Sequence, residues 1–443
     1  MIPVFERSAP LLALVVVIAS GVGCGRADND SGHWVGTIER ERSRTSLILD
    51  LGGESGSRAS LSDVALYDLP VVQQRVGKRL RLRATFHGQT VEALLHRDGP
   101  ELAGVASAGA QTASVHLTRT GPSEPVPYRE ESLTITGGPK PIGATLFLPV
   151  TPAAHPAVVL VHGSHGPSRA DLRGPAIVFA RSGIAVLTYD KRDLGFDQSL
   201  PHRYGFLELA GDAVRAVNTL AARSDVDRRH LGVWGISEGG WIAPAIASRS
   251  PLVRFVIAVS PPAVSYAVVI DVTTRRGLAR HKFSQREIAE AISALHRVND
   301  FVRHGGDRSA LDVFLRAAAQ RSWGRSAGIP LPRHAPTAEE MSREVRWREL
   351  DVDPAIWWLS VHVPVFAVWG GDDDHPVAQS VAAIRVALAA AGNRDATLIV
   401  YPHADHELLE SGKGGRSWPR LAPGFIDAMT AWTREHVGLA KYR

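Results

Sequence analysis

The stretch 231–241, LGVWGISEGGW, contains the residue types best suited to chemistry in this chain. Its first residues are apolar and β-prone, and the small, glycine-rich segment after them cannot continue a strand. A helix rich in Ala and Ile is predicted at 241–248. At the apex of such a strand–turn–helix unit, Ser237 projects its hydroxyl clear of the backbone, and Gly235 and Gly239 let strand and helix pass close together. The pattern predicts a nucleophile elbow with Ser237 as the nucleophile.

A serine nucleophile needs a base and a carboxylate that orients the base, and two later stretches contain both residue types. The predicted strands 365–369 and 397–401 are followed by GGDDDH and PHADH. Catalytic groups of a parallel sheet gather at the carboxyl ends of its strands, so we expect these segments to lie near the elbow. The chain order Ser, acid, His is the order that this type of elbow uses. We predict a catalytic triad of Ser237, Asp373 and His406.

Neighbouring residues compete for two of these roles. Asp373 is preferred to Asp372 and Asp374 by its spacing from the end of the strand, and the choice among the three stays open. His406 is preferred to His403 because it lies deeper in the predicted loop. An imidazole suits the role of base because its pKa lies near neutrality.

The segment HGSHG at 162–166 follows another predicted strand, 157–161. A tetrahedral oxyanion requires backbone N–H groups aimed at it. With this type of elbow, one N–H comes from the residue after the nucleophile and the other from a loop after an earlier strand. We therefore predict an oxyanion hole formed by the backbone N–H groups of Ser164 and Glu238.

Two other polar features are assigned structural roles. His162 and His165 are of a metal-ligand type, but no cysteine or carboxylate pattern accompanies them, so we predict neither a metal site nor a cofactor. Asp190 and Arg192 follow the predicted strand 184–189. Arg192 could bind a substrate carboxylate, but we favour an ion pair between Asp190 and Arg192 that holds the loop.

Strands of continuous apolar character alternate with helix-length segments through residues 128–443. Strands without alternation are buried on both faces, which indicates a mostly parallel sheet covered by helices. From about 265 to 357 the alternation stops, and capping boxes at 284–287 and 337–340 indicate helices instead. We predict a helical cap inserted after the sixth strand of the sheet.

The first 120 residues have a different texture. An apolar run at 11–18 is too short to span a bilayer and fits a signal peptide, and the only cysteine, Cys24, comes soon after it. We predict that residues 1–24 are a signal that exports the chain, to the periplasm, to a membrane through a lipidated Cys24, or into the medium. At 32–120, short alternating runs between glycine-rich turns predict a small antiparallel β domain.

The charge pattern argues against one class of partner. The 443 residues carry a formal net charge of +5, from basic residues dispersed among acids. Such dispersed charge is typical of a solvated surface, so nucleic-acid binding is not predicted. The sequence leaves the oligomeric state open.

Five stretches of the chain carry a resemblance to a known family: PAVVLVHGS (156–164), YDKR (189–192), GISEGG (235–240), HVPVFAV (362–368) and AGN (391–393). With them, the chain from about residue 131 to 437 resembles the α/β-hydrolase superfamily, and more closely the exported bacterial esterases with a dienelactone-hydrolase-like catalytic domain. The resemblance implies an eight-stranded, mostly parallel sheet with helices on both faces and a helical cap, preceded by a small β domain. It also implies hydrolysis of short acyl esters.

These observations predict a serine hydrolase that cleaves small-molecule carboxylic esters through an acyl-enzyme on Ser237. A peptidase or a thioesterase on the same fold stays an alternative, because a fold does not fix a substrate. A non-catalytic exported binding protein that retains the fold is the alternative of a different class.

Overall fold

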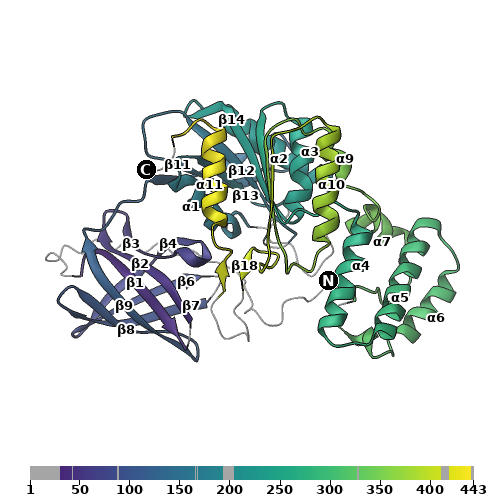
Figure 1. Cartoon of the computed structure of the whole chain (residues 1–443), viewed down its shortest axis with the longest axis horizontal. Helices are drawn as coiled ribbons and strands as arrows, with labels where there is room; N and C mark the ends of the chain where they lie inside the picture. Colours follow the sequence, from purple (N-terminus) through teal and green to yellow (C-terminus); the bar gives the residue numbers. More distant parts are fainter. Residues whose placement is uncertain are drawn as a thin grey trace.

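The computed structural model describes residues 30–440 apart from 42, 87–88, 165, 167, 193–203, 327–328 and 411–418. The predicted signal segment with Cys24, and His165, lie outside the described residues. The described chain consists of an antiparallel β domain and a larger α/β domain from which a group of helices projects (Figure 1). Within the described ranges, no helix combines the length and apolar character needed to cross a membrane.

Nine antiparallel strands form the N-terminal domain, which confirms the predicted small all-β domain. Their order is β4-β3-β2-β1-β9-β8-β7-β6-β5, and β4 at one edge also contacts β6 near the other edge, so the sheet is almost a closed barrel. Alternate residues face inward, and Leu80 and Leu82 are buried while Arg79 and Arg83 are exposed. The strands are β1 (Gly32–Arg40), β2 (Ser43–Gly53), β3 (Gly56–Leu61), β4 (Leu66–Pro70), β5 (Val72–Val76), β6 (Arg79–Phe86), β7 (Gln89–Asp98), β8 (Glu101–Ala108) and β9 (Gln111–Gly121).

The second domain is built on an eight-stranded sheet in the order β10-β11-β13-β12-β14-β15-β16-β17. Strands β12 to β17 pair in parallel, whereas β11 is antiparallel to both of its neighbours. Every residue of β12, β13 and β16 is buried, as continuous apolar strands require. The strands are β10 (Tyr128–Ile135), β11 (Ile142–Pro149), β12 (His155–Val161), β13 (Ala185–Tyr189), β14 (Val226–Ile236), β15 (Val253–Val259), β16 (Val365–Gly370) and β17 (Ala396–Tyr401).

Helices cover both faces of this sheet (Figure 1). Phe179 and Trp432 belong to the core on one face, and Ile242 and Ile384 belong to the core on the other. Two helices therefore pack on the first face and three on the second, which confirms the predicted layers. The first pair is α1 (Arg173–Arg181) and α11 (Phe425–His436), and the others are α2 (Phe206–Ala221), α3 (Glu238–Arg249) and α10 (Val377–Ala390).

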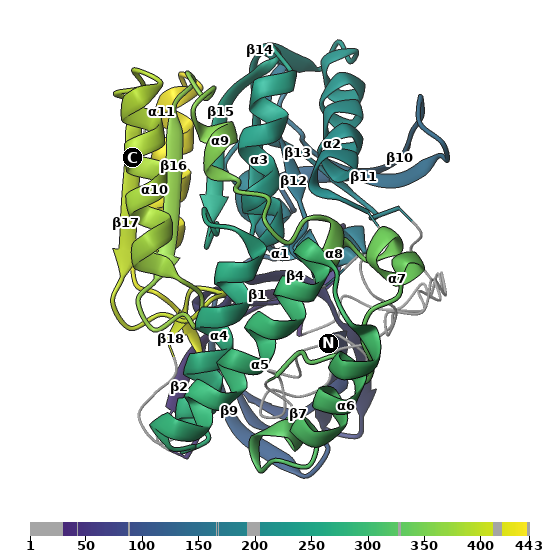
Figure 2. The ribbon, with the colours of Figure 1, turned by 90° about the vertical axis from the view of Figure 1, so that its right-hand side faces the viewer.

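The segment between β15 and β16 is helical, as predicted. Ser284 and Thr337 cap their helices, each in a capping box with the glutamate three residues later. Most of the inserted helices lie beyond the carboxyl ends of the strands, whereas the last, Ala355–Trp358, packs against α3 and α10. Figure 2 shows the helices Tyr266–Arg280, Gln285–His304 and Arg308–Ala318 in front of the β domain, which borders the same edge from the other side. We call the inserted helices the cap; they are α4 (Tyr266–Arg280), α5 (Gln285–His304), α6 (Arg308–Ala318), α7 (Ala338–Arg343), α8 (Val345–Arg348) and α9 (Ala355–Trp358).

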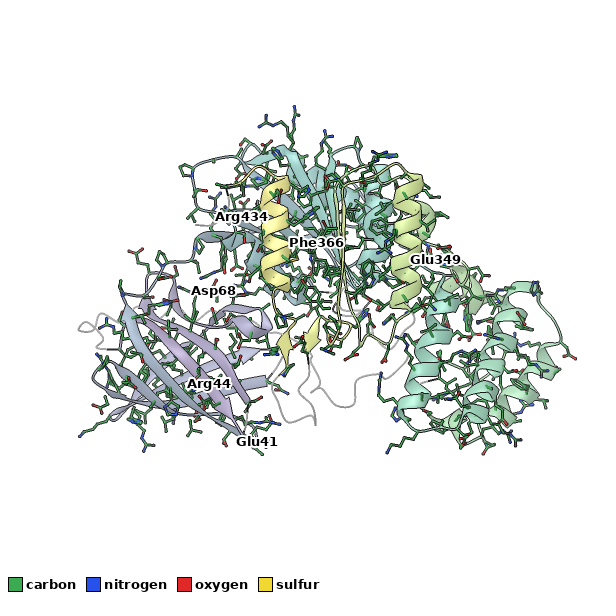
Figure 3. All side chains as sticks on the ribbon, in the orientation of Figure 1. Glu41, Arg44, Asp68, Glu349, Phe366 and Arg434 are labelled. Carbon is green, nitrogen blue, oxygen red and sulfur yellow. The ribbon has the colours of Figure 1, made fainter. Side chains whose placement is uncertain are left out.

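One buried carboxylate joins the β domain to the α/β domain. Asp68, in the middle of β4, faces the larger domain in Figure 3 and is only 3% exposed. Its carboxylate accepts hydrogen bonds from Tyr128 Oη at 3.0 Å and from Arg181 Nη1 at 3.0 and 3.1 Å. The Arg58 guanidinium, from the β domain itself, lies 3.5 Å away. A buried charge with this many partners should fix the contact between the domains.

Replacing Asp68 by alanine should lower the free energy of unfolding by about 3 kcal/mol, because it leaves buried cationic and phenolic partners without their acceptor. Chemical denaturation followed by tryptophan fluorescence would measure the loss. Arg44→Ala is the matched control, because Arg44 pairs with Glu39 on the exposed side of the same domain. Equal transitions for both variants and the wild type would contradict this role of Asp68.

Candidate active site

Ser237 occupies the sharp turn between β14 and α3. Its backbone has φ 55° and ψ −116°, a combination that non-glycine residues rarely adopt and that costs free energy. Helix α3 begins at Glu238, immediately after the serine and three residues before its predicted start. The strained conformation is that of a nucleophile elbow, in which the hydroxyl stands clear of the strand.

The two glycines of the elbow are required by close contacts. A methyl group at Gly235 would lie 2.2 Å from the carbonyl oxygen of Gly239, and one at Gly239 would lie 2.3 Å from that of Val161. These distances are far below van der Waals contact, so neither position admits a side chain. The first turn of α3 therefore lies directly against the end of β12.

The predicted acid and base are in contact. His406 Nδ1 donates a hydrogen bond to Asp373 Oδ2 at 2.8 Å, and Asp373 is 2% exposed. Of the other two aspartates, Asp372 is exposed and Asp374 pairs with Arg280 of α4. Among the described residues, Asp373 is thus the member of the aspartate run that can orient the His406 imidazole.

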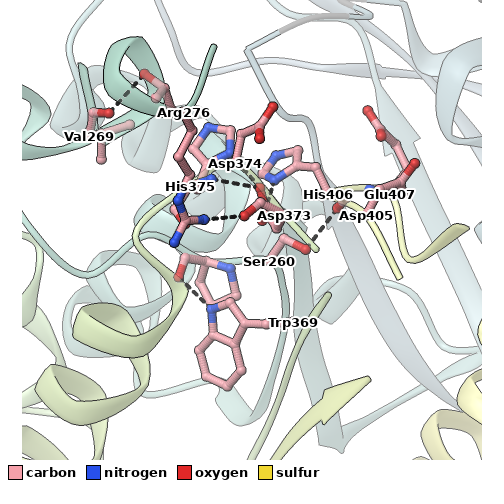
Figure 4. Close-up of polar contacts among 12 residues, drawn as sticks. Ser260, Val269, Arg276, Trp369, Asp373, Asp374, His375, Asp405, His406 and Glu407 are labelled. Atoms are coloured by element: carbon pink, nitrogen blue, oxygen red, sulfur yellow. Dashed lines mark hydrogen bonds and ion pairs between the residues drawn. The ribbon is translucent and has the colours of Figure 1, made fainter. Parts of the chain in front are cut away.

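The His406 loop contacts the residue after β15, as Figure 4 shows, and it also contacts the acid turn after β16. Ser260, directly after β15, donates from Oγ to the carbonyl oxygen of His406 at 2.7 Å. The preceding residue, Val259, accepts a hydrogen bond from the backbone N–H of Ser237 at 2.9 Å. A methyl group at Gly370 would lie 2.0 Å from Asp405 O, so the acid turn and the histidine loop also touch. The three predicted triad residues therefore follow strands that end at the same edge of the sheet, with β15 between the strand of Ser237 and that of Asp373.

The serine and the histidine are not hydrogen-bonded to each other in the described part of the chain. Nδ1 of His406 is engaged by Asp373, which leaves Nε2 as the nitrogen able to accept a proton. In enzymes without substrate, such nucleophile–base contacts are often long and tighten when substrate binds. The triad assignment of Ser237, Asp373 and His406 stays a prediction.

The loop after β12 lies beside Ser237. A methyl group at Gly163 would be 3.4 Å from Ser237 Cβ, and Ser164 follows in the same loop. His162 anchors the loop, because its Nε2 donates to the carbonyl oxygen of Tyr189 at the end of β13. Burial lowers the pKa of His162 to about 4, so it is a neutral anchor at physiological pH. The oxyanion-hole roles of Ser164 and Glu238 remain predictions, supported by this proximity.

Charge at the acid–base pair is set by competition between burial and hydrogen bonding. Burial favours the protonated acid, but hydrogen bonds from His375 and His406 outweigh it and hold the pKa of Asp373 below its usual range. Burial also disfavours a charged imidazole, yet the hydrogen bond and the charge of Asp373 raise the pKa of His406 above its usual value. The pair is thus arranged to stabilise a protonated imidazole, as a general base requires.

His375 is a member of the site that sequence reasoning missed. Its Nδ1 donates to Asp373 Oδ1 at 2.8 Å, its backbone N–H donates to the same oxygen at 2.9 Å, and its ring stacks on that of His406 with centroids 4.1 Å apart. The signal available in the sequence was its place two residues after Asp373. That position puts a second imidazole within reach of the carboxylate once the turn forms.

Donor atoms of Asp373, His375 and His406 lie within 4.8 Å of one another, a grouping that deserves comparison with metal sites. Both Nδ1 atoms already donate hydrogen bonds to the carboxylate, and the rings are tilted by only 23°. In-plane lone pairs of two stacked rings point side by side rather than at one centre, whereas metal ligands must converge. The cluster fits a hydrogen-bonded acid–base group better than a metal centre.

The predicted ion pair between Asp190 and Arg192 is wrong. Arg192 instead forms two hydrogen bonds with Asp212 of α2, the one from Nη2 at 2.6 Å, and Asp190 accepts from the backbone N–H of Arg169 at 2.8 Å. The structural role predicted for Arg192 holds, with a different partner. The reason is that α2 packs beside the sheet and presents a buried aspartate to the strand end.

The raised pKa of His406 can be measured without a substrate. By NMR titration, we expect the His406 imidazole to lose its proton above the usual value of about 6.5. Asp373→Asn removes the stabilising negative charge, so the pKa of His406 should fall, whereas Asp372→Asn should leave it unchanged. If the pKa of His406 is the same in Asp373→Asn as in the wild type, the Asp373 carboxylate does not control the protonation of this imidazole.

Comparison with known proteins gives partial matches. No protein-family model matches the chain. Esterase EstD of Thermotoga maritima is 35% identical over 148 residues, which make up 32% of this chain and 34% of that protein. Thiohydrolase aneE of Aspergillus aculeatus is 32% identical over 107 residues, or 24% of this chain and 34% of that protein. The chain thus matches about a third of the length of these curated relatives.

Among solved structures, the dienelactone hydrolase of Anabaena variabilis is similar, with 17% identity and a TM-score of 0.39 over 71% of this chain and 100% of that one. The assignment of the fold rests on this chain's own topology. The strand order, with an antiparallel second strand, and the elbow between β14 and α3 are those of the α/β-hydrolase fold. The larger domain of this protein therefore has the α/β-hydrolase fold.

Proposed function

We propose that this protein is a serine hydrolase that cleaves small-molecule carboxylic esters. The observation that carries the proposal is the strained Ser237 elbow at the same sheet edge as a hydrogen-bonded Asp373–His406 pair. An elbow serine, an imidazole and a buried carboxylate are the parts that nucleophilic acyl transfer requires. The local similarity to an esterase supports the ester as substrate.

Each group has a defined part in the proposed reaction. Ser237 Oγ attacks the ester carbonyl carbon while His406 Nε2 takes its proton, and Asp373 stabilises the resulting imidazolium. The carbonyl oxygen becomes an oxyanion that accepts hydrogen bonds from the N–H groups of Ser164 and Glu238. When the intermediate collapses, His406 returns the proton to the departing alcohol. Water, deprotonated by His406, then attacks the acyl-enzyme and releases the acid and free Ser237.

A thioesterase is the second candidate, because the chain is also similar to a thiohydrolase over 107 residues. The same serine, base and oxyanion donors would act, and only the leaving group would differ, a thiol in place of an alcohol. Rates with matched oxygen and thiol esters of one acyl group decide between them. A ratio of kcat/KM in favour of the thioester would replace the proposed substrate class and keep the mechanism.

Purified protein should hydrolyse p-nitrophenyl acetate or butyrate and be labelled by a fluorophosphonate at Ser237. Ser237→Ala should abolish labelling and reduce turnover by about 10³-fold or more, because the attacking oxygen is gone. Mass spectrometry of the labelled peptide identifies the residue. Wild-type protein that neither turns over esters nor reacts with the probe would refute the proposed function.

The three aspartates can be separated by activity. Asp373→Asn should lower kcat by roughly 10²- to 10⁴-fold, because the amide neither fixes the correct tautomer nor stabilises the imidazolium. Asp372→Asn is the matched control and should stay near wild type, and Asp374→Asn should cost much less than Asp373→Asn, because it removes only the ion pair with Arg280. Since the base must be neutral, kcat/KM should fall as the pH drops through the raised pKa of His406. An equal loss in all three variants would reject Asp373 as the acid.

We also propose that the chain is exported and lipidated at Cys24, on the basis of the apolar segment before this cysteine. Expression of the full chain in a bacterium with radiolabelled palmitate should label the wild type and leave Cys24→Ser unlabelled. Cell fractionation should place the labelled form with membranes. An unlabelled wild-type chain in the periplasm or medium would favour export without an anchor.

A further inference from the structure

We propose that His375 is a positioning residue for the catalytic acid, which it holds so that one carboxylate oxygen faces His406. The inference rests on the proposed function, since it assigns Asp373 to the triad. Oδ1 of Asp373 accepts both the Nδ1–H and the backbone N–H of His375, at 2.8 and 2.9 Å, and Oδ2 accepts His406 Nδ1 at 2.8 Å. Figure 4 shows the carboxylate between the two imidazoles.

The two contacts on Oδ1 remove a freedom that would harm the triad. A carboxylate held only by His406 could rotate about its Cβ–Cγ bond and change the plane in which it accepts the Nδ1 proton. Donors on both oxygens fix that plane, and the stacked ring of His375 supports the face of the His406 ring. Small displacements of catalytic groups cost large factors in rate, so such support has a measurable effect.

Contacts from the cap hold the tight turn that contains His375. Arg276 of α4 donates from Nη1 to the carbonyl oxygens of Asp373 and His375, the second at 2.9 Å. One helical turn further on, Arg280 pairs with Asp374. Three consecutive residues of the acid turn are therefore bound to one face of a cap helix, which fixes the backbone from which the His375 ring projects.

The hydrogen bond from His375 also bears on the charge of the acid. It helps to hold the pKa of Asp373 below its usual range, so the carboxylate attracts the His406 proton less strongly than it would without that donor. Other charged groups surround the pair: Arg276 and Arg280 from α4, Asp374 from the acid turn, and Asp405 and Glu407 from the histidine loop. Removing the donor on Oδ1 should therefore raise the pKa of His406.

Two variants separate the hydrogen bond from the ring. His375→Asn keeps a donor that can reach Oδ1, so kcat should stay within about threefold of wild type and the fall of kcat/KM at low pH should stay where it is in the wild type. His375→Phe keeps the stacked ring and removes the donor, so kcat should fall about tenfold or more with KM little changed, and the fall of kcat/KM at low pH should move to higher pH. His403→Asn, in the facing loop, is the matched control.

NMR titration of His406 in the same variants gives a readout independent of substrate, and the pKa of His406 should rise in His375→Phe and stay near wild type in His375→Asn. The positioning role is overturned if His375→Phe keeps the wild-type kcat and the wild-type fall of kcat/KM at low pH, and if the titration of His406 is unchanged in this variant. If the wild type shows no hydrolysis at all, the proposed function fails, and the NMR titration alone decides whether His375 and His406 share Asp373. Circular dichroism confirms that each variant is folded.

Discussion

A single buried carboxylate, that of Asp373, determines the arrangement at the carboxyl edge of the sheet. An isolated ionised group in such a place would cost several kcal/mol, so it persists only with donors on both oxygens. The donors come from its own turn, His375, and from the next strand's loop, His406. The loops that supply them are held in turn by Ser260 and by Arg276 of the cap. Satisfying one charge thus aligns three segments that are distant in the chain.

The elbow imposes a second constraint, which is steric. Ser237 keeps an unfavourable backbone conformation because β14, the first turn of α3 and the end of β12 are packed too closely for any alternative. That packing needs glycine at positions 235 and 239, where any side chain would collide with a carbonyl oxygen. The strain and the close approach are therefore one feature: the strand and helix that fix the serine also bring the loop of Gly163 against it.

Local patterns predicted the parts of this site and could not predict their connections. The elbow, the apolar strands and the capping boxes depend on residues close in sequence, so the sequence alone predicts them. The partners of Arg192 and Asp373 depend on packing: Asp212 lies on α2, and Arg276 is 97 residues before the carbonyl that it contacts. The role of His375 was missed for a different reason. His375 is close to Asp373 in sequence, but its ring contacts the Asp373 carboxylate only when the acid turn has formed.

The place of the cap explains how a long insertion coexists with a precise site. The chain leaves the sheet after β15 at Pro261, whose carbonyl accepts a hydrogen bond from Trp369 of β16 at 2.9 Å. It returns at Val365, which pairs with Val256 in the parallel ladder. The exit and the return are thus fixed to each other, and the helices between them leave the register of the sheet unchanged. Contacts from α4 to the acid turn then connect the position of the cap directly to the position of Asp373.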